Sequence, residues 1–245
     1  MKKLRGQIPP MVTPFDRNGN ICESSVAQLV QFLNARVQGL FVCGSYGGGP
    51  LMSVAERKSL VEIVSKNIAS DVELVVHVGT TNTRDSVDLS KHAQAHGASR
   101  VAAVAPYYFQ HSADNIKRFF ERLVEAVDIP VYFYNNPKLT GFTAEVDFVR
   151  DLKNIGVVGM KDSSFDIVAF ERFQRELGGD DFDIVLGTEA MLLSAAALGA
   201  QAFIPGLGNA FPEICGELFE AAMSGDLQRA RKAQADVNKL RDIMY

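Results

Sequence analysis

Several features that mark whole classes of protein are missing or scarce in this sequence of 245 residues. It contains no tryptophan, and its three cysteines, Cys22, Cys43 and Cys215, lie far apart without a Cys-x-x-Cys pair. An odd number of scattered cysteines excludes a disulfide scaffold and predicts reduced thiols in a cytoplasmic protein. The sequence also lacks a P-loop, an early Gly-x-Gly-x-x-Gly turn and a Gly-x-Ser-x-Gly elbow. These absences disfavour nucleotide binding and serine-hydrolase chemistry.

Basic charge and long apolar runs are scarce as well. Lys and Arg number 25 against 29 Asp and Glu, so the net charge is -4 and no basic surplus is left for nucleic acid. The basic start, Met1–Gly6, is followed by Gln7 and Pro10 rather than by apolar residues, which argues against a signal peptide. The longest apolar stretch, Ala190–Gly208, is interrupted by Pro205 and reads as a buried helix and strand. We therefore expect no membrane partner.

What the sequence does contain is a repeated pair of elements. Short apolar runs that end in glycine or a polar residue alternate with longer segments of helical periodicity. Most of these runs are apolar throughout, as strands are when both faces of a parallel sheet are buried. The expected strands are Ile8–Thr13, Gly39–Cys43, Glu73–Val78, Arg100–Ala105, Pro130–Tyr134, Gly156–Met160, Phe182–Leu186 and Ala202–Pro205.

The segments between the strands predict amphipathic helices. Ser53 stands three residues before Glu56, a capping box that marks a helix start. Eight strand and helix units favour a (β/α)8 TIM barrel over a doubly wound open sheet. We expect this catalytic barrel over residues 1–225, followed by a C-terminal helix, part of a helical bundle, over 226–245. The clearest helical segments are Ser24–Arg36, Ser53–Ala69, Thr83–His96 and Ser112–Val127.

The active site of such a barrel lies at the C-terminal ends of its strands. The strand expected at Gly156–Met160 leads directly into Lys161. Apolar surroundings lower the pKa of a lysine, and a neutral amine attacks a ketone to form a Schiff base. The alternative is an ordinary lysine whose charge reaches solvent at the barrel rim.

Two neighbouring strand ends carry groups that suit the same chemistry. Tyr134 ends the fifth strand, and a tyrosine hydroxyl can move the protons that imine formation requires. Ser45 lies in the glycine-rich loop Gly44–Pro50 after the second strand, where backbone N–H groups and a hydroxyl can bind a carboxylate. Both features are also compatible with plain structural roles, the tyrosine packing at the rim and the loop forming a turn.

Other candidate sites are weaker. His92 and His96 have the spacing of zinc ligands on a helix, but no third ligand follows them, so the pair is interpreted as part of an outer helix face. His77 lies within a strand and His111 in a loop, which disfavours a metal-dependent aldolase built on a histidine cluster. The turn Gly206–Asn209 opens a helix, where barrels commonly hold a phosphate or carboxylate, although a plain connection fits equally well.

Taken together and in this order, these residues resemble the dihydrodipicolinate synthase and N-acetylneuraminate lyase superfamily of pyruvate-dependent class I aldolases. The resemblance extends along the whole chain. Its motifs are Pro10-Met-Val-Thr-Pro-Phe15, Gly44-Ser45-x-Gly47, Pro106-Tyr107-Tyr108, Tyr134-Asn135-x-Pro137 and Gly159-x-Lys161-Asp162.

The resemblance implies a role for each matching residue. Lys161 would be the Schiff-base lysine, Tyr134 the proton shuttle, and Ser45 the hydroxyl that links Tyr134 to Tyr108. In many members that tyrosine reaches into the neighbouring subunit, usually within a homotetramer, so we expect at least a homodimer. Ser45 and Tyr46 would bind the pyruvate carboxylate, and the Ile204 carbonyl would face the reacting centre. The full set of expected substrate-binding residues is Ser45, Tyr46, Gly47, Leu139, Gly187, Glu189 and Ile204.

Differences from the family pattern bear on the substrate. Leu139 stands where synthases of lysine biosynthesis carry an arginine, and the Gly48–Pro50 run is closer to 2-keto-3-deoxy sugar-acid aldolases. The expected function is therefore cleavage or condensation of such a sugar acid, with pyruvate and an aldehyde as partners and neither metal nor organic cofactor. One alternative is dihydrodipicolinate synthase, with Lys138 replacing the arginine. The other is an inactive barrel that only binds pyruvate.

Overall fold

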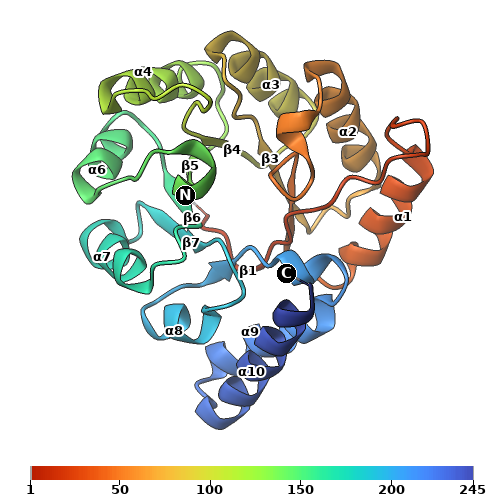
Figure 1. Ribbon diagram of the computed structural model, residues 1–245, viewed down its shortest axis with the longest axis vertical. Coiled ribbons are helices and arrows are strands. Elements are labelled where there is room, and N and C mark those ends of the chain that lie inside the picture. Colours follow the sequence, from red (N-terminus) through yellow and green to blue (C-terminus); the bar gives the residue numbers. More distant parts are fainter. Residues whose placement is uncertain (1, 245) are drawn as a thin grey trace.

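The computed structural model describes residues 2–244 and shows an eight-stranded parallel sheet rolled into a barrel (Figure 1). The expected (β/α)8 architecture is confirmed. The strands follow one another around the barrel in chain order, and β1 pairs with β8. They are β1 (Gly6–Gln7), β2 (Gly39–Val42), β3 (Glu73–His77), β4 (Arg100–Val104), β5 (Val131–Asn135), β6 (Gly159–Asp162), β7 (Asp183–Leu186) and β8 (Ala202–Phe203).

The barrel closes between β1 and β2 through an irregular segment. Phe41 N–H donates to the Pro9 carbonyl at 2.9 Å, and Met11 N–H donates to the Phe41 carbonyl at 3.0 Å. Pro9 and Pro10 have no N–H to contribute, so the regular ladder ends at Gln7. The first strand therefore lies before the segment 8–13 that the sequence pattern indicated.

Helices surround the barrel, one after each strand (Figure 1). Ser53 caps α2 with the expected capping box to Glu56, whereas α3 is capped by Asn82. The surrounding helices are α1 (Glu23–Asn34), α2 (Val54–Asn67), α3 (Thr83–Ala95), α4 (Ala113–Val124), α6 (Val146–Asn154), α7 (Ile167–Leu177), α8 (Leu192–Ala197) and α9 (Pro212–Ser224). Three short helices lie in loops after strands, namely η1 (Gly49–Leu51), α5 (Pro137–Thr140) and η2 (Gly206–Asn209).

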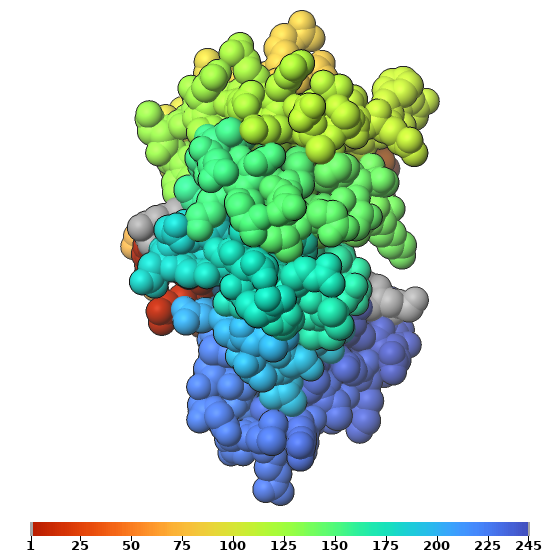
Figure 2. Space-filling model, turned by 90° about the vertical axis from the view of Figure 1, so that its left-hand side faces the viewer, coloured from red at the N-terminus to blue at the C-terminus, as the bar shows by residue number. Residues whose placement is uncertain are grey.

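One further helix, α10 (Leu227–Met244), packs against α9. It buries Ala230, Ala233 and Val237, and together with α9 it forms one end of the molecule, coloured blue in Figure 2. Its last turns approach the opening of the barrel (Figure 1). Within residues 2–244, no helix combines the length and apolar character needed to cross a membrane.

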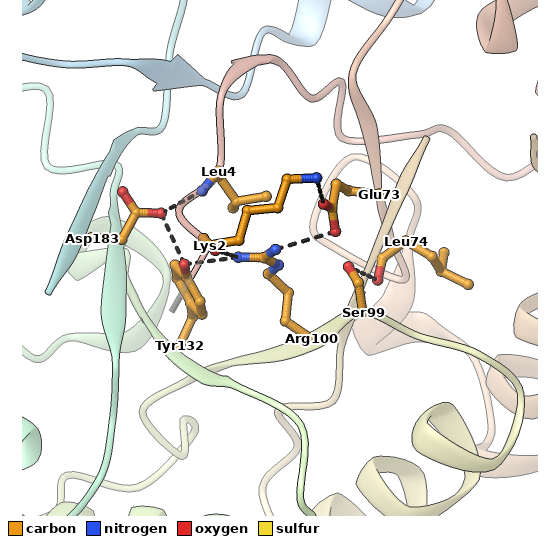
Figure 3. A network of polar contacts seen from close by, with 8 residues as sticks. All are labelled: Lys2, Leu4, Glu73, Leu74, Ser99, Arg100, Tyr132 and Asp183. Atoms are coloured by element: carbon orange, nitrogen blue, oxygen red, sulfur yellow. Dashed lines mark hydrogen bonds and ion pairs between the residues drawn. The ribbon is translucent and has the colours of Figure 1, made fainter. Parts of the chain in front are cut away.

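A polar network fills the N-terminal end of the barrel (Figure 3). Arg100 Nη1 donates to the Tyr132 hydroxyl at 3.0 Å, and Arg100 Nη2 pairs with Glu73 at 3.1 Å. The Tyr132 hydroxyl donates to Asp183 at 2.8 Å, and Leu4 N–H donates to the same carboxylate at 3.0 Å. Buried charges need such partners. Because buried Leu4 and this network occupy the N-terminal end, the space for a ligand lies at the opposite end.

The strand β6 begins three residues later than the sequence pattern suggested. Gly156 adopts a φ of 104° in the turn after α6, and pairing with β5 begins when Val158 N–H donates to the Val131 carbonyl at 3.0 Å. Lys161 consequently lies within β6 rather than behind it, in register with Tyr134 on β5. Both side chains therefore belong to the barrel interior.

Candidate active site

A cavity of about 630 Å³ opens where the strands end. Its wall is built from residues of several strands and the loops that follow them, as in other barrels of this type. Seven of the residues singled out from the sequence line it: Ser45, Tyr46, Tyr134, Leu139, Lys161, Gly187 and Glu189. The fold thus brings together residues that are more than a hundred positions apart in the chain.

The Lys161 amine is buried between aromatic rings at the base of this cavity. Lys161 is 4% exposed, and its Nζ lies 3.9 Å from the centroid of the Tyr134 ring and 4.2 Å from that of Phe41. Burial lowers the pKa of Lys161, and Tyr134 opposes part of that shift. Since a lysine attacks a carbonyl only as the neutral amine, these surroundings suit Schiff-base formation.

Tyr134 is held by polar neighbours as well as by packing. Asn136 Nδ2 donates to its hydroxyl at 3.0 Å. Burial raises the pKa of Tyr134, while the positive charge of Lys161 acts against that effect. Hydrogen bonds with Ser45 and Ser163 lower the same pKa further, so that it lies below the ordinary tyrosine value. A fixed hydroxyl with a lowered pKa can give and take protons beside the amine.

The loop after β2 owes its shape to its glycines and to one strained residue. Cys43 has a φ of 60°, which is costly for a residue with a side chain. A Cβ at Gly49 would lie 1.8 Å from the Cys43 carbonyl oxygen, so only glycine fits there. Gly47 is buried, and its carbonyl accepts a hydrogen bond from the Thr13 hydroxyl at 2.7 Å. It therefore helps to hold the loop in shape but does not line the cavity.

Two buried basic residues, His77 and Arg57, form hydrogen bonds that support this loop. His77 Nδ1–H donates to the carbonyl of the strained Cys43 at 3.1 Å, and Val104 N–H donates to His77 Nε2 at 3.3 Å. Arg57 donates to the His77 and Gly79 carbonyls at 2.5 and 3.0 Å. Burial lowers the pKa of His77 well below its usual value, and the nearby charges of Arg57 and Lys161 act in the same direction. The sequence pattern indicated a strand histidine but not this supporting role.

The far wall of the cavity contains an ion pair that sequence reasoning missed. Arg241 from α10 donates to Glu189 Oε1 at 2.5 Å, and Gly206 N–H donates to Glu189 Oε2 at 2.9 Å. Glu189 is 1% exposed, so its charge is compensated inside the protein. No local sequence motif identifies Arg241 as a cavity residue, because its position there depends on how α10 packs.

The remaining predicted residues have different surroundings. A Cβ at Gly187 would lie 2.5 Å from the Asp162 carbonyl oxygen, a backbone atom, so glycine is required directly after β7. Leu139 is 56% exposed at the cavity edge. Ile204 is buried after β8, in the same interior cluster as Tyr134, and does not line the cavity.

Tyr108 stands apart from the other predicted site residues. It is 87% exposed, has a φ of 80°, and its ring contacts Phe109 at a centroid distance of 5.0 Å. It does not line the cavity of its own chain. Its proposed part in a neighbouring subunit's site therefore stays a prediction.

Metal-ligating side chains gather elsewhere. Among residues 2–244, one group of His, Cys, Asp or Glu side chains is close enough to hold an ion, formed by Glu62, His92 and His96. None of the three lines the cavity.

Known proteins share both the sequence and the fold. The chain is 30% identical over 247 residues to 4-hydroxy-tetrahydrodipicolinate synthase of Methanopyrus kandleri, covering 99% of this chain and 82% of the relative. It is also 30% identical over 244 residues to N-acetylneuraminate lyase of Escherichia coli strain SMS-3-5, covering 98% and 82%.

Among solved structures, it is similar to YagE, a prophage protein of Escherichia coli K12 crystallised in complex with pyruvate. The TM-score is 0.93 at 29% identity, covering 98% of this chain and 82% of that one. Residues 3–245 match the dihydrodipicolinate synthetase family. The chain therefore belongs to that family and is a pyruvate-dependent class I aldolase.

Proposed function

We propose that this aldolase cleaves a 2-keto-3-deoxy sugar acid into pyruvate and an aldehyde, and condenses the two in reverse, with Lys161 carrying the keto acid as an imine. The observation that carries the proposal is the buried Lys161 amine beside the Tyr134 hydroxyl at the base of the cavity. One residue supplies the nucleophile and the other the proton.

The first half of the reaction forms the imine. Neutral Lys161 Nζ attacks the C2 carbonyl of the substrate and gives a carbinolamine. The Tyr134 hydroxyl protonates the departing oxygen, which leaves as water. The products of this step are a positively charged imine on Lys161 and a Tyr134 phenolate, and the charge of each stabilises the other.

The second half breaks the C3–C4 bond. The Tyr134 phenolate takes the proton from the C4 hydroxyl, the C4 oxygen forms a carbonyl, and the bonding electrons move into the protonated imine. The aldehyde leaves, and an enamine remains on Lys161. Protonation of the enamine at C3 and hydrolysis of the imine then release pyruvate and restore the amine.

The loop after β2 is the proposed binding site for the pyruvate carboxylate. The Ser45 hydroxyl and the Tyr46 side chain line the cavity from this loop. Ser45 also forms a hydrogen bond with Tyr134, so a carboxylate held here lies beside the proton shuttle. Gly47 shapes the loop, and Ile204 is expected to act only through its backbone carbonyl.

The opposite wall supports the choice of a sugar acid. Arg241 is already paired with Glu189, whose carboxylate is 1% exposed. A substrate carboxylate that captured Arg241 would leave Glu189 with a buried charge and one fewer partner, which is costly. A pair of opposite charges is better suited to the donor and acceptor hydroxyl groups of a polyol chain. Leu139 at the edge adds no charge.

A second candidate is condensation of pyruvate with aspartate semialdehyde. The observation in its favour is that Lys138 also lines the cavity and offers a cation for a second carboxylate. The similarity to 4-hydroxy-tetrahydrodipicolinate synthase and to N-acetylneuraminate lyase is equally close, so the substrate has to be tested directly.

Steady-state kinetics with 2-keto-3-deoxygluconate and with pyruvate plus aspartate semialdehyde would separate the two. We expect kcat/KM for the sugar acid to be at least about tenfold higher, a gap of roughly 1.4 kcal/mol in transition-state binding. Lys138→Ala is the matched variant and should leave sugar-acid cleavage unchanged. Efficient condensation of aspartate semialdehyde that Lys138→Ala abolishes would establish the synthase instead.

The active form is proposed to be at least a homodimer. Tyr108 and Phe109 are 87% and 70% exposed, and Tyr108 has a left-handed backbone conformation. Strained backbone of this kind clusters at active sites and ligand-binding positions, yet Tyr108 does not line the cavity of its own chain. We propose that it lies in the cavity of a neighbouring subunit.

A further inference from the structure

We propose that Glu62, His92 and His96 form a binding site for a divalent transition-metal ion on the outer surface of the barrel, away from the aldolase cavity. Glu62 lies on α2 and His92 on α3, and His96 ends α3; the two helices are neighbours in the outer ring (Figure 1). One ligand atom from each of the three lies within 4.8 Å of the others.

The third ligand is what the sequence did not show. The spacing of His92 and His96 places both rings on one face of α3, and the rings stack with centroids 4.0 Å apart. Packing of α2 against α3 then brings in Glu62, whose Oε1 lies 3.0 Å from His92 Nε2 and 4.0 Å from His96 Nε2. The ligands of a tetrahedral zinc ion are about 3.3 Å apart, as bonds of about 2 Å require.

His96 is oriented for metal binding by a hydrogen bond. Its Nδ1 lies 2.9 Å from the His92 carbonyl oxygen. A carbonyl oxygen only accepts, so Nδ1 carries the proton and Nε2 keeps its lone pair, on the side of Glu62. A bond from the second ring nitrogen to a backbone carbonyl is the usual way in which metal-binding histidines are fixed.

His92 has to exchange a hydrogen bond for a metal bond. Its Nε2 now donates to Glu62, and its Nδ1 is buried without a hydrogen-bond partner among the described residues. A metal ion at Nε2 moves the proton to Nδ1, so the bond to the metal has to offset the lost hydrogen bond to Glu62 and the buried N–H. Glu62 is placed to share the same ion, because its Oε1 faces Nε2 of both rings.

The donor set points to the class of ion. Two imidazoles and one carboxylate suit Zn²⁺, Cu²⁺ or Ni²⁺, whereas Mg²⁺ and Ca²⁺ prefer oxygen ligands alone. The Glu62 side chain is 43% exposed, so water can complete the coordination. Lys66 is the nearby cation and weakens the attraction of the site for a positive ion. An ion bound here would link α2 to α3.

Titration calorimetry with ZnCl₂ on chelator-treated protein tests the proposal. We expect one ion per chain, with affinity lowered at least about tenfold in His92→Gln, His96→Gln and Glu62→Gln. Zn²⁺ should also raise the melting temperature of the wild type, and should do so less in each variant. Matched controls are His111→Gln and Cys22→Ser, which remove other accessible ligands and should bind Zn²⁺ as the wild type does.

Two results would overturn the site. One is wild-type binding no tighter than that of a variant in which all three residues are replaced by Gln. The other is binding that depends on Cys22 or His111 instead. Because Glu62 is a partly exposed residue and Gln has nearly its shape, the Glu62→Gln variant keeps the test valid if a histidine variant folds poorly. Activity is not part of the readout, so failure here leaves the proposed aldolase reaction untouched.

Discussion

The Nζ of Lys161 lies 3.9 Å from the centre of the Tyr134 ring, on neighbouring strands whose residues are paired in register. Each side chain affects the acidity of the other: Tyr134 raises the pKa of Lys161, and the charge of Lys161 lowers the pKa of Tyr134. The pair can therefore share one proton between amine and phenol, which is what the proposed imine chemistry uses.

Removing the Tyr134 hydroxyl tests its part in the reaction. In Tyr134→Phe we expect the fold to be kept, the imine to form slowly, and kcat to fall by roughly 10²–10⁴-fold, the usual contribution of a positioned proton donor. Pyruvate release and the circular dichroism spectrum are the measurements. Asn136→Ala, which removes a donor to the same hydroxyl, should cost less. A Tyr134→Phe enzyme with wild-type kcat would reduce Tyr134 to a packing residue.

The pH dependence of imine formation follows from the same pair. Its rate should rise with pH as Lys161 loses its proton, at a pH below that of an ordinary lysine because burial lowers the pKa of Lys161. Tyr134 raises that pKa, so Tyr134→Phe should move the rise toward lower pH. Borohydride trapping after timed incubation with pyruvate gives the rate. A rise that moves toward higher pH in the variant contradicts this assignment.

A mixing experiment tests whether subunits share a site. Lys161→Ala and Tyr108→Ala should each lose most activity. If Tyr108 completes the neighbour's site, unfolding and refolding the two variants together creates mixed dimers with one intact site. About a quarter of the wild-type activity should then return. Mixing that restores nothing, or a Tyr108→Ala enzyme with full activity, would refute the shared site.

The buried His77 predicts an acid-sensitive stability. Its pKa lies well below 6.5 in the folded protein, so below pH 6.5 the unfolded chain binds one proton more and the folded state loses stability as pH falls. This contribution is absent above that pH and approaches about 1.4 kcal/mol per pH unit below it. His77→Gln offers a donor to Cys43 and an acceptor to Val104 without titrating.

Urea unfolding at about pH 7.5 and about pH 5.5 measures the effect. The free energy of unfolding should fall less between these pH values in His77→Gln than in the wild type. Equal losses in both proteins would show that His77 is not the group responsible.

Much of the fold and several of the residues that line the cavity could be predicted from local patterns, for physical reasons. A strand that is buried on both faces is continuously apolar, so it can be recognised from a few consecutive residues. The start of α2 can be recognised in the same way, because Ser53 and Glu56 satisfy its first N–H groups. The limits of β6 were misjudged because Gly156 and Val157 are as apolar as strand residues, although Gly156 turns the chain.

The residues that were missed are the ones that depend on packing between distant segments. Arg241 reaches the cavity only because the last turns of α10 approach the barrel opening, and Glu62 meets His92 only because α2 and α3 pack side by side. Neither contact has a signature in the neighbouring sequence. Side chains brought together by tertiary structure alone cannot be read from spacing within one helix.

The central claim is that pyruvate is carried on Lys161, and one measurement tests it most directly. The protein is incubated with pyruvate and borohydride, digested, and its peptides are analysed by mass spectrometry. The account predicts a reduced pyruvyl group on Lys161 in the wild type and in Lys138→Ala, and none in Lys161→Ala. Labelling of another lysine, or active enzyme that is never labelled, would contradict it.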